Sequence, residues 1–203
     1  IFEPIRLCGT SVSRATLHNQ DFINDLDIGI GDNILVYKSG EIIPKVKEVL
    51  HDKRPAGVKT FVIPDKCPVC GAPTYREENT ADIKCSSATC PAQLERHIIN
   101  FVGRDAMDIK GFGTAYIEEL IHQDYLHDIA DIYGLYEYRD ELIEKGILGK
   151  EKNTDKLLGV IEASKENDAY RLLTGLGIPG IGKAAAKSLL DYFGSIDAVA
   201  KAE

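Results

Sequence analysis

The stretch from Cys67 to Cys90, CPVCGAPTYREENTADIKCSSATC, says most about this chain. Two residues separate its first two cysteines, four separate its last two, and fourteen lie between the pairs. That interval is long enough to fold back as a hairpin and to bring both pairs of thiolates to one ion. Four thiolates in this pattern favour tetrahedral zinc. The sequence therefore predicts one structural zinc site with the ligands Cys67, Cys70, Cys85 and Cys90.

Two other uses of these cysteines stay open, a pair of disulfides and an iron–sulfur cluster, and we rank both below zinc. Pro68 and Gly71 support a metal site, because a tight turn there points backbone N–H groups at the sulfurs. Since the protein would supply all four ligands, a structural role is favoured over a catalytic one. His97 is expected to be a surface or packing residue, and Cys8 a buried packing residue.

Length and composition are those of a globular protein. A chain of 203 residues is expected to form two or three small units. The sequence shows neither a charged-then-apolar leader nor an apolar run of eighteen residues. We therefore expect a cytoplasmic chain that makes no use of a membrane.

The net charge of −8 argues against a nucleic-acid binder that works through a broad positive field. The acidic excess lies in the C-terminal half, where residues 106–203 carry eleven Lys and Arg against eighteen Asp and Glu. Residues 1–66 are balanced, with nine of each sign. If the C-terminal half binds DNA, it must use backbone donors and a few placed cations.

The pattern along the chain predicts three units, residues 1–63, 64–92 and 93–203. The first is expected to be a small β unit. Its strands are predicted over residues 5–12, 33–38 and 41–50, and a short helix over residues 19–26. These strands are too few for a closed barrel, so the chain is expected to start partway into this unit.

The third unit is expected to be helical. Pro91 suits a first helical position, and Leu94, Ile98, Phe101 and Val102 form the stripe of a half-buried helix. Further helices are predicted over residues 114–123, 136–145, 155–166, 168–174 and 183–193. These segments are short and separated by turns.

Two glycine turns each precede one of these helices. Their sequences are IKGFG over residues 109–113 and IPGIGK over residues 178–183. We expect the apolar residue between the glycines to anchor the turn, while the glycines adopt backbone angles that side chains would block. The N–H groups would then face outward beside a helix N-terminus and form a phosphate seat. Such a turn is similar to the helix-hairpin-helix motif of DNA repair and replication proteins, which grips phosphates without reading sequence.

A simple helix connector is the alternative for each turn. The second turn is the more specific, because Lys183 could add a cation to the phosphate and the alanines after it allow close helix packing. A third turn, Gly146-Ile147-Leu148-Gly149, has two residues between its glycines. We assign it no phosphate contact and expect it to pack.

The order of these parts is distinctive. SVSRATLHN at residues 11–19, Gly31-Asp32, KSGEIIP at 38–44, the four cysteines and LGIPGIG at 176–182 follow one another. Over essentially its whole length the chain resembles NAD-dependent bacterial DNA ligases. The resemblance implies a multi-domain α+β fold: part of a small β-barrel (OB-fold), a four-cysteine zinc finger and an all-α helix-hairpin-helix domain. In that family an NAD-recognition domain and an adenylation domain precede these parts, and a BRCT domain follows.

The family's nucleophile is a lysine in a Lys-x-Asp-Gly motif, which this chain lacks. The resemblance therefore implies no catalytic residue and no NAD site here, and the chain alone is not expected to ligate. NAD and magnesium would serve the full-length parent. What remains would be a monomeric clamp that holds nicked double-stranded DNA regardless of sequence, with the zinc unit as a rigid joint.

By the resemblance, Arg14 and Thr16 match the family's Ser-Arg-Ala-Thr signature near the nick. Lys38 and Lys45 are weaker candidates, since a solvated strand face explains them as well. The remaining expected DNA contacts are Gly111, Gly113, Gly180, Gly182 and Lys183. Two rival interpretations remain, a non-enzymatic scaffold for branched or damaged DNA and a protein-interaction module with the glycine turns as connectors.

Overall fold

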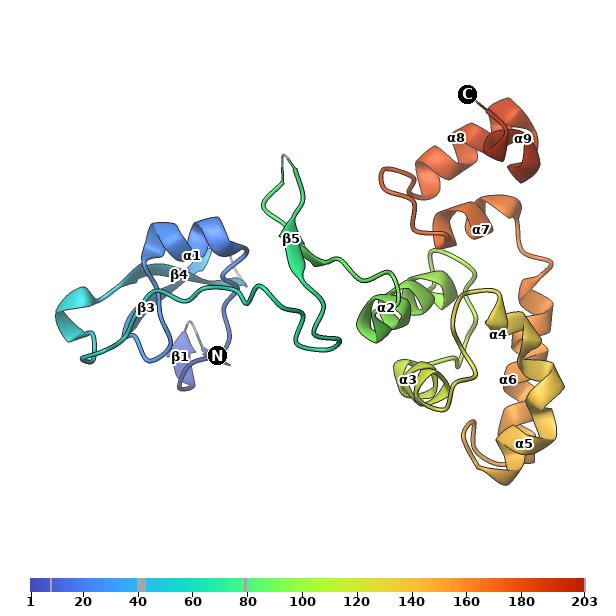
Figure 1. Cartoon of the computed structure of the whole chain (residues 1–203), viewed down its shortest axis with the longest axis horizontal. Helices are drawn as coiled ribbons and strands as arrows, with labels where there is room; N and C mark the ends of the chain where they lie inside the picture. Colours follow the sequence, from blue (N-terminus) through green and yellow to red (C-terminus); the bar gives the residue numbers. More distant parts are fainter. Residues whose placement is uncertain (8, 40–42, 79, 203) are drawn as a thin grey trace. The chain divides into compact units, whose positions relative to one another are not determined.

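The structure, a computed structural model, describes residues 1–7, 9–39, 43–78 and 80–202, except the side chains of Lys38 and Ser39 (Figure 1). The expectation for Cys8 lies outside these residues. The chain divides into two units, Ile1–Ser87 and Ala88–Glu203. Among the described residues, no helix combines the length and the apolar character needed to span a bilayer.

The described residues of the first unit form six short strands, one α-helix, one 3₁₀ helix and long connections. Its β-hairpins pair β1 (Ile5–Leu7) with β2 (Thr10–Val12), β3 (Ile34–Ser39) with β4 (Ile43–Val49), and β5 (Thr74–Arg76) with β6 (Ile83–Cys85). All three pairs are antiparallel. The strand predicted over residues 5–12 is wrong as one element, because Gly9 adopts φ +80° and the chain reverses between β1 and β2.

Helix α1 (Gln20–Leu26) begins and ends at well-defined caps. The side chain of Asn19 accepts a hydrogen bond from Phe22 N at 2.9 Å, and Asp27 stops the helix in the left-handed conformation. This helix buries Ile23 against Val46 and Val49 of β4. The predicted helix over residues 19–26 is thus confirmed.

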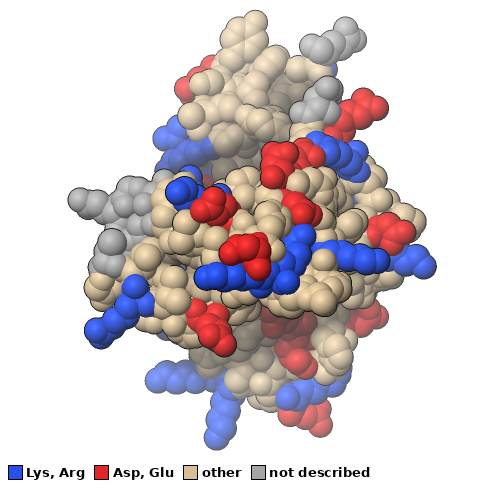
Figure 2. Space-filling model, turned by 90° about the vertical axis from the view of Figure 1, so that its left-hand side faces the viewer, with Lys and Arg blue, Asp and Glu red and all other residues tan. Residues whose placement is uncertain are grey.

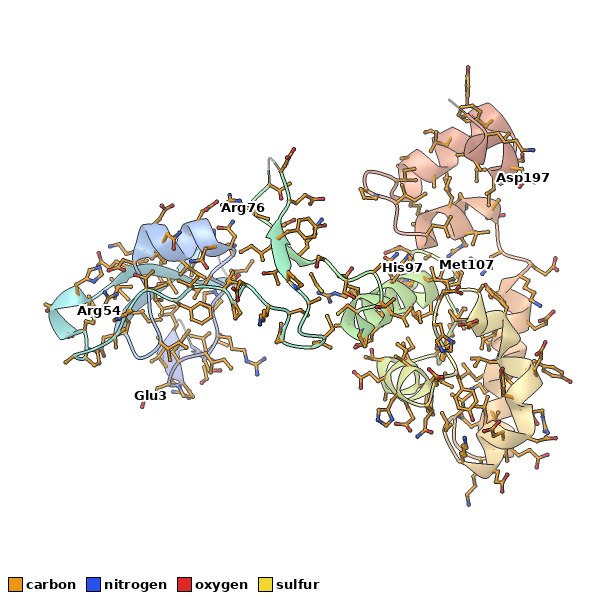
Figure 3. The ribbon with its side chains drawn as sticks, in the orientation of Figure 1. Glu3, Arg54, Arg76, His97, Met107 and Asp197 are labelled. Carbon is orange, nitrogen blue, oxygen red and sulfur yellow. The ribbon has the colours of Figure 1, made fainter. Side chains whose placement is uncertain are left out.

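A partly buried ion-pair network joins Arg54, in the connection after β4, to Asp27 and Asp32. Figure 3 labels Arg54, which follows the 3₁₀ helix η1 (His51–Lys53). Its guanidinium donates from Nε to Asp32 Oδ1 at 2.7 Å and from Nη1 to Asp27 Oδ2 at 2.8 Å. The Asp32 carboxylate is fully buried, and the hydrogen bond from Arg54 lowers its pKa.

The described residues of the second unit form helices joined by turns and loops. Its α-helices are α2 (Pro91–Val102), α3 (Thr114–His122), α4 (Asp131–Gly134), α5 (Arg139–Glu144), α6 (Glu151–Ser164), α7 (Ala169–Gly175), α8 (Lys183–Phe193) and α9 (Ile196–Ala200), with the 3₁₀ helix η2 (Leu135–Tyr138) before α5. The predicted stripe of α2 is confirmed, since Ile98, Phe101 and Val102 are buried and Leu94 packs beside them.

Several helices differ from prediction. The helix predicted over residues 136–145 consists of η2 and α5, and α4 and α9 were not predicted. Helix α6 starts at Glu151, four residues before its predicted start at residue 155. Glu and Lys have high helix propensity, and an acidic side chain in the first turn is favoured by the helix dipole. The charged run there therefore extends the helix.

Candidate metal centre and nucleic-acid interface

The four predicted cysteine ligands come together. One sulfur from each of Cys67, Cys70, Cys85 and Cys90 lies within 4.8 Å of the other three. Zinc–sulfur bonds of about 2.3 Å make a tetrahedron with edges of roughly 3.8 Å, so this cluster fits zinc. The Sγ atoms of Cys70 and Cys85 lie 3.4 Å apart, well beyond the roughly 2.05 Å of a disulfide.

Local backbone geometry prepares this site. Gly71 adopts φ +73°, and its N–H bonds to the carbonyl of Cys67 at 2.9 Å. The backbone N–H of Cys70, and then that of Val69, lowers the pKa of the Cys67 thiol to about 7. This confirms the expected turn with N–H groups at the sulfur, which favours the thiolate form that a metal ligand needs.

The last ligand also starts a helix. Cys90 is 1% exposed and is the N-cap residue of α2, with Pro91 at its first position. Pro suits this position because its missing N–H would have no partner there. A metal bound by Cys90 would therefore fix the N-terminus of α2 in place.

The SRAT segment presents one side to solvent and the other to the core. Ala15 and Leu17 pack against the core of the first unit, whereas Arg14 and Thr16 are exposed. Thr16 pairs with Lys45 of β4 through a parallel β-bridge. The structure thus brings two predicted contacts, Thr16 and Lys45, side by side.

Arg14 makes no hydrogen bond or ion pair within the described parts of the chain, and it remains a prediction as a DNA contact. Lys38 lies opposite Pro44 in the β3–β4 pair, but its side chain is outside the described residues. On the end of the first unit that faces the viewer in Figure 2, Lys and Arg are interspersed with Asp and Glu. A contact with DNA here would depend on individual side chains.

The two glycine turns have matching geometry. Phe112 N bonds to Ile109 O at 3.2 Å, and Ile181 N bonds to Ile178 O at 3.0 Å. The third residue of each turn, Gly111 or Gly180, adopts a φ of +88° or +82°. Type II turns need such an angle at that place. These two glycines therefore confirm the expectation of backbone angles that residues with a side chain rarely adopt.

The same expectation is wrong for the second glycine of each turn. Gly113 and Gly182 have φ values of −78° and −86° and serve as N-caps of α3 and α8. A Cβ at either position would meet nothing within 4 Å. Neither backbone angle nor packing within the chain demands glycine here. The missing side chain instead leaves the first-turn N–H groups of each helix without a side-chain cap.

A group of cations beside the second turn was only partly predicted. The cationic groups of Lys183, Lys187 and Arg171 lie 5.9, 4.6 and 5.7 Å from the ring centroid of Tyr170. Lys183 was a candidate, whereas the other three residues were missed. The i, i+4 spacing of the two lysines on one helix face was the available signal.

The third glycine turn joins α5 to α6, and its hydrogen bond links the two glycines themselves. Gly149 N bonds to Gly146 O at 3.1 Å. Leu148 between them is fully buried in the helical core. This agrees with the expectation that the segment packs.

The fold and sites define a multi-domain chain in which a β unit and a four-cysteine centre precede helices joined by glycine hairpins. Family models match three parts: the NAD-dependent DNA ligase OB-fold domain at residues 1–58, the NAD-dependent DNA ligase C4 zinc finger domain at 66–92, and the helix-hairpin-helix motif at 171–203. The chain thus carries the OB-fold and C4 zinc finger domains of NAD-dependent DNA ligases.

Relatives named DNA ligase align with the whole chain or nearly so. The protein of Clostridium kluyveri is 49% identical over 202 residues, which are 100% of this chain and 30% of the relative. For Clostridioides difficile the identity is 48% over the same shares, and for Symbiobacterium thermophilum 45% over 98% of this chain and 29% of the relative. The chain thus spans about 30% of the length of these relatives.

Proposed function

We propose that this chain is the DNA-holding part of an NAD-dependent ligase that seals nicks between a 3′ hydroxyl and a 5′ phosphate. In the full-length parent, the reaction would pass through AMP-lysine and AMP-DNA intermediates and use NAD and magnesium. The chain lacks a Lys-x-Asp-Gly motif, so this part would be inactive and bind no NAD. We propose a monomer that acts in the bacterial cytoplasm.

This proposal rests on the N-termini of α3 and α8, where a glycine N-cap leaves the first-turn N–H groups without a side-chain cap. Gly113 and Gly182 leave backbone N–H groups open to solvent, although nothing inside the chain requires glycine there. A phosphate needs such donors and close approach to the backbone. The arrangement supports phosphate binding without a positive field, as expected for a half of the chain with an acidic excess.

The proposed contacts fall on both units. Arg14, Thr16, Lys38 and Lys45 would meet DNA from the OB-fold, and Gly111, Gly113, Gly180, Gly182 and Lys183 from the hairpins. Zinc held by the four cysteines would cross-link residues 64–92 into a rigid zinc finger. This finger would be the joint between the OB-fold (1–63) and the helices (93–203). No sequence would be read, because phosphates carry no base information.

The test is a titration of the zinc-loaded chain with nicked and intact duplexes of unrelated sequence across a salt series. Affinity that falls steeply with salt and ignores sequence would support the phosphate clamp. A preference for the nick would support the ligase role, whereas tighter binding to branched DNA would favour the non-enzymatic alternative. Absence of binding at low salt would refute the claim that this chain alone holds DNA.

A further inference from the structure

Each glycine turn joins two helices into a hairpin: α2 and α3 form the first hairpin, and α7 and α8 the second. Side chains of each hairpin bond backbone carbonyls of the other. From α2, His97 Nε2 donates to Leu176 O at 2.9 Å and Asn100 Nδ2 to Gly175 O at 3.3 Å. Both carbonyls lie at the C-terminal end of α7, immediately before the second glycine turn. Helix ends leave such carbonyls without helical partners, so these two side chains also cap α7.

Bonds also run in the opposite direction. Asn167, just before α7, donates from Nδ2 to Met107 O at 2.7 Å. Arg171 on α7 donates from Nη1 to Ala106 O at 2.7 Å and to Arg104 O at 3.2 Å. These three carbonyls belong to the loop that leads from α2 into the first glycine turn. Each hairpin is therefore held by side chains from the other.

The backbones meet closely where these bonds form. A Cβ added to Gly175 would lie 2.8 Å from Phe101 Cδ2 and 3.3 Å from Ala106 Cβ. A Cβ at Gly177 would lie 3.5 Å from the His97 ring. Figure 3 labels His97 and Met107 on the α2 side of this contact, next to α7. Close packing and directed hydrogen bonds together leave the hairpins little freedom to move relative to each other.

The two hairpins differ in charge despite matching backbone geometry. Counted from the N-cap glycine, Lys183 and Lys187 of α8 correspond to Thr114 and Glu118 of α3. Lys110 adds one cation to the first turn, and its Nζ lies 3.7 Å from Asp108 Oδ2. With this partner and with Glu118 nearby, the first hairpin attracts an anion less strongly than the second. It would gain from being held at a fixed distance from the cationic second hairpin.

We propose that His97, Asn100, Asn167 and Arg171 form a reciprocal clasp that makes the two hairpins one bivalent site for duplex DNA. This inference rests on the proposed function. Phosphates of a duplex stand at fixed separations, whereas those of a single strand do not. Two sites at a fixed matching distance bind a rigid partner with a high effective concentration. The four side chains are positioning residues, and the clasp favours duplex over single-stranded DNA.

The test removes the donors of α2 without touching the glycine turns or any cation. A His97→Leu, Asn100→Leu double variant is compared with His97→Gln, which keeps an amide donor, and with Gln123→Leu. Gln123 is a matched control because, within the described part of the chain, its side-chain amide bonds Glu119 alone, at the exposed end of α3. Arg171 is left intact, since its charge could itself attract phosphate.

The double variant should bind a nicked duplex about tenfold more weakly, with its affinity for a single strand and its melting temperature nearly unchanged. His97→Gln and Gln123→Leu should bind duplex as the wild type does. Duplex affinity that stays unchanged in the double variant overturns the clasp, as does an equal loss for both forms of DNA. Failure of the wild type to bind any duplex would instead refute the proposed function, and the clasp with it.

A second measurement needs no DNA. Amide hydrogen exchange at Ile181, whose N–H closes the second turn on Ile178 O, should be faster in the double variant than in the wild type. Exchange that is unchanged there overturns the claim that α2 holds the second hairpin. This measurement also separates local loosening from global unfolding, because core amides such as that of Ile98 should exchange as before.

Discussion

Replacing Gly182 with serine should move stability and DNA binding in opposite directions. Gly182 is the N-cap of α8, has φ −86° and offers open space for a side chain. Serine fits this position without strain, and its hydroxyl can accept a hydrogen bond from a first-turn N–H. Exchange of glycine for serine at an N-cap stabilises a helix by a few tenths of a kcal/mol.

The same hydroxyl would occupy a donor that we assign to phosphate and would hinder its approach. A hydrogen bond to a charged group contributes about 1.5–3 kcal/mol, so duplex affinity should fall by roughly tenfold to a hundredfold. Thermal unfolding measures the first effect and fluorescence anisotropy with labelled duplex the second. Structural damage cannot produce this pair of results, because damage would lower both quantities.

Gly134→Ser provides the matched control. Gly134 also has open space for a Cβ, and it ends α4, precedes η2 and belongs to neither glycine turn. This variant should bind DNA as tightly as the wild type. If Gly182→Ser kept full affinity, or if Gly134→Ser lost as much, the assignment of phosphate to the α8 N-terminus would be refuted.

Three further predictions concern the zinc centre and the packing of each unit. The wild type should contain one zinc per chain by elemental analysis. Cys67→Ser should lose the metal, the ordered β5–β6 hairpin and DNA affinity together, because the free energy of metal binding contributes to folding. A variant that kept all three would contradict this. Gly175→Ala should lower the melting temperature, since its Cβ would press on Phe101, and overpacking costs about 1–3 kcal/mol against about 1 kcal/mol gained in helix propensity. Arg54 lowers the pKa of Asp32 in the folded chain, so the stabilisation from Asp32 is present above its unfolded pKa and is lost as pH falls through its folded pKa. The Asp32→Asn variant should therefore be less stable at neutral pH, and its stability should depend less on pH during acid unfolding. Identical acid titrations of variant and wild type would contradict this.

The sequence predicted what depends on local spacing. The cysteine motif, the apolar stripe of α2 and the turn glycines 111 and 180 each specify a geometry within a few residues. Ser195 shows that more was available. Its hydroxyl caps α9 by accepting from Ala198 N at 3.1 Å, directly after Gly194 ends α8 with φ +79°. A glycine C-cap followed by a serine N-cap predicts this helix.

Contacts between distant segments could not be predicted in the same way. His97 was expected to be a surface or packing residue, and it is exposed, but its bond to Leu176 joins residues 79 positions apart. Tertiary packing likewise produces the bridge between Thr16 and Lys45 and the group of cations beside the Tyr170 ring. No periodic pattern encodes such pairs, because each partner satisfies its own local rules.

The roles of the paired glycines show how composition and geometry combine in this chain. In each hairpin the first glycine is explained by its backbone angle, whereas the second is explained by nothing within the chain. An acidic half that binds a polyanion must bring donors close without broad positive charge. A bare helix N-terminus does this, and a side chain there would obstruct it. The proposed approach of a DNA phosphate to the helix N-terminus therefore explains the second glycine.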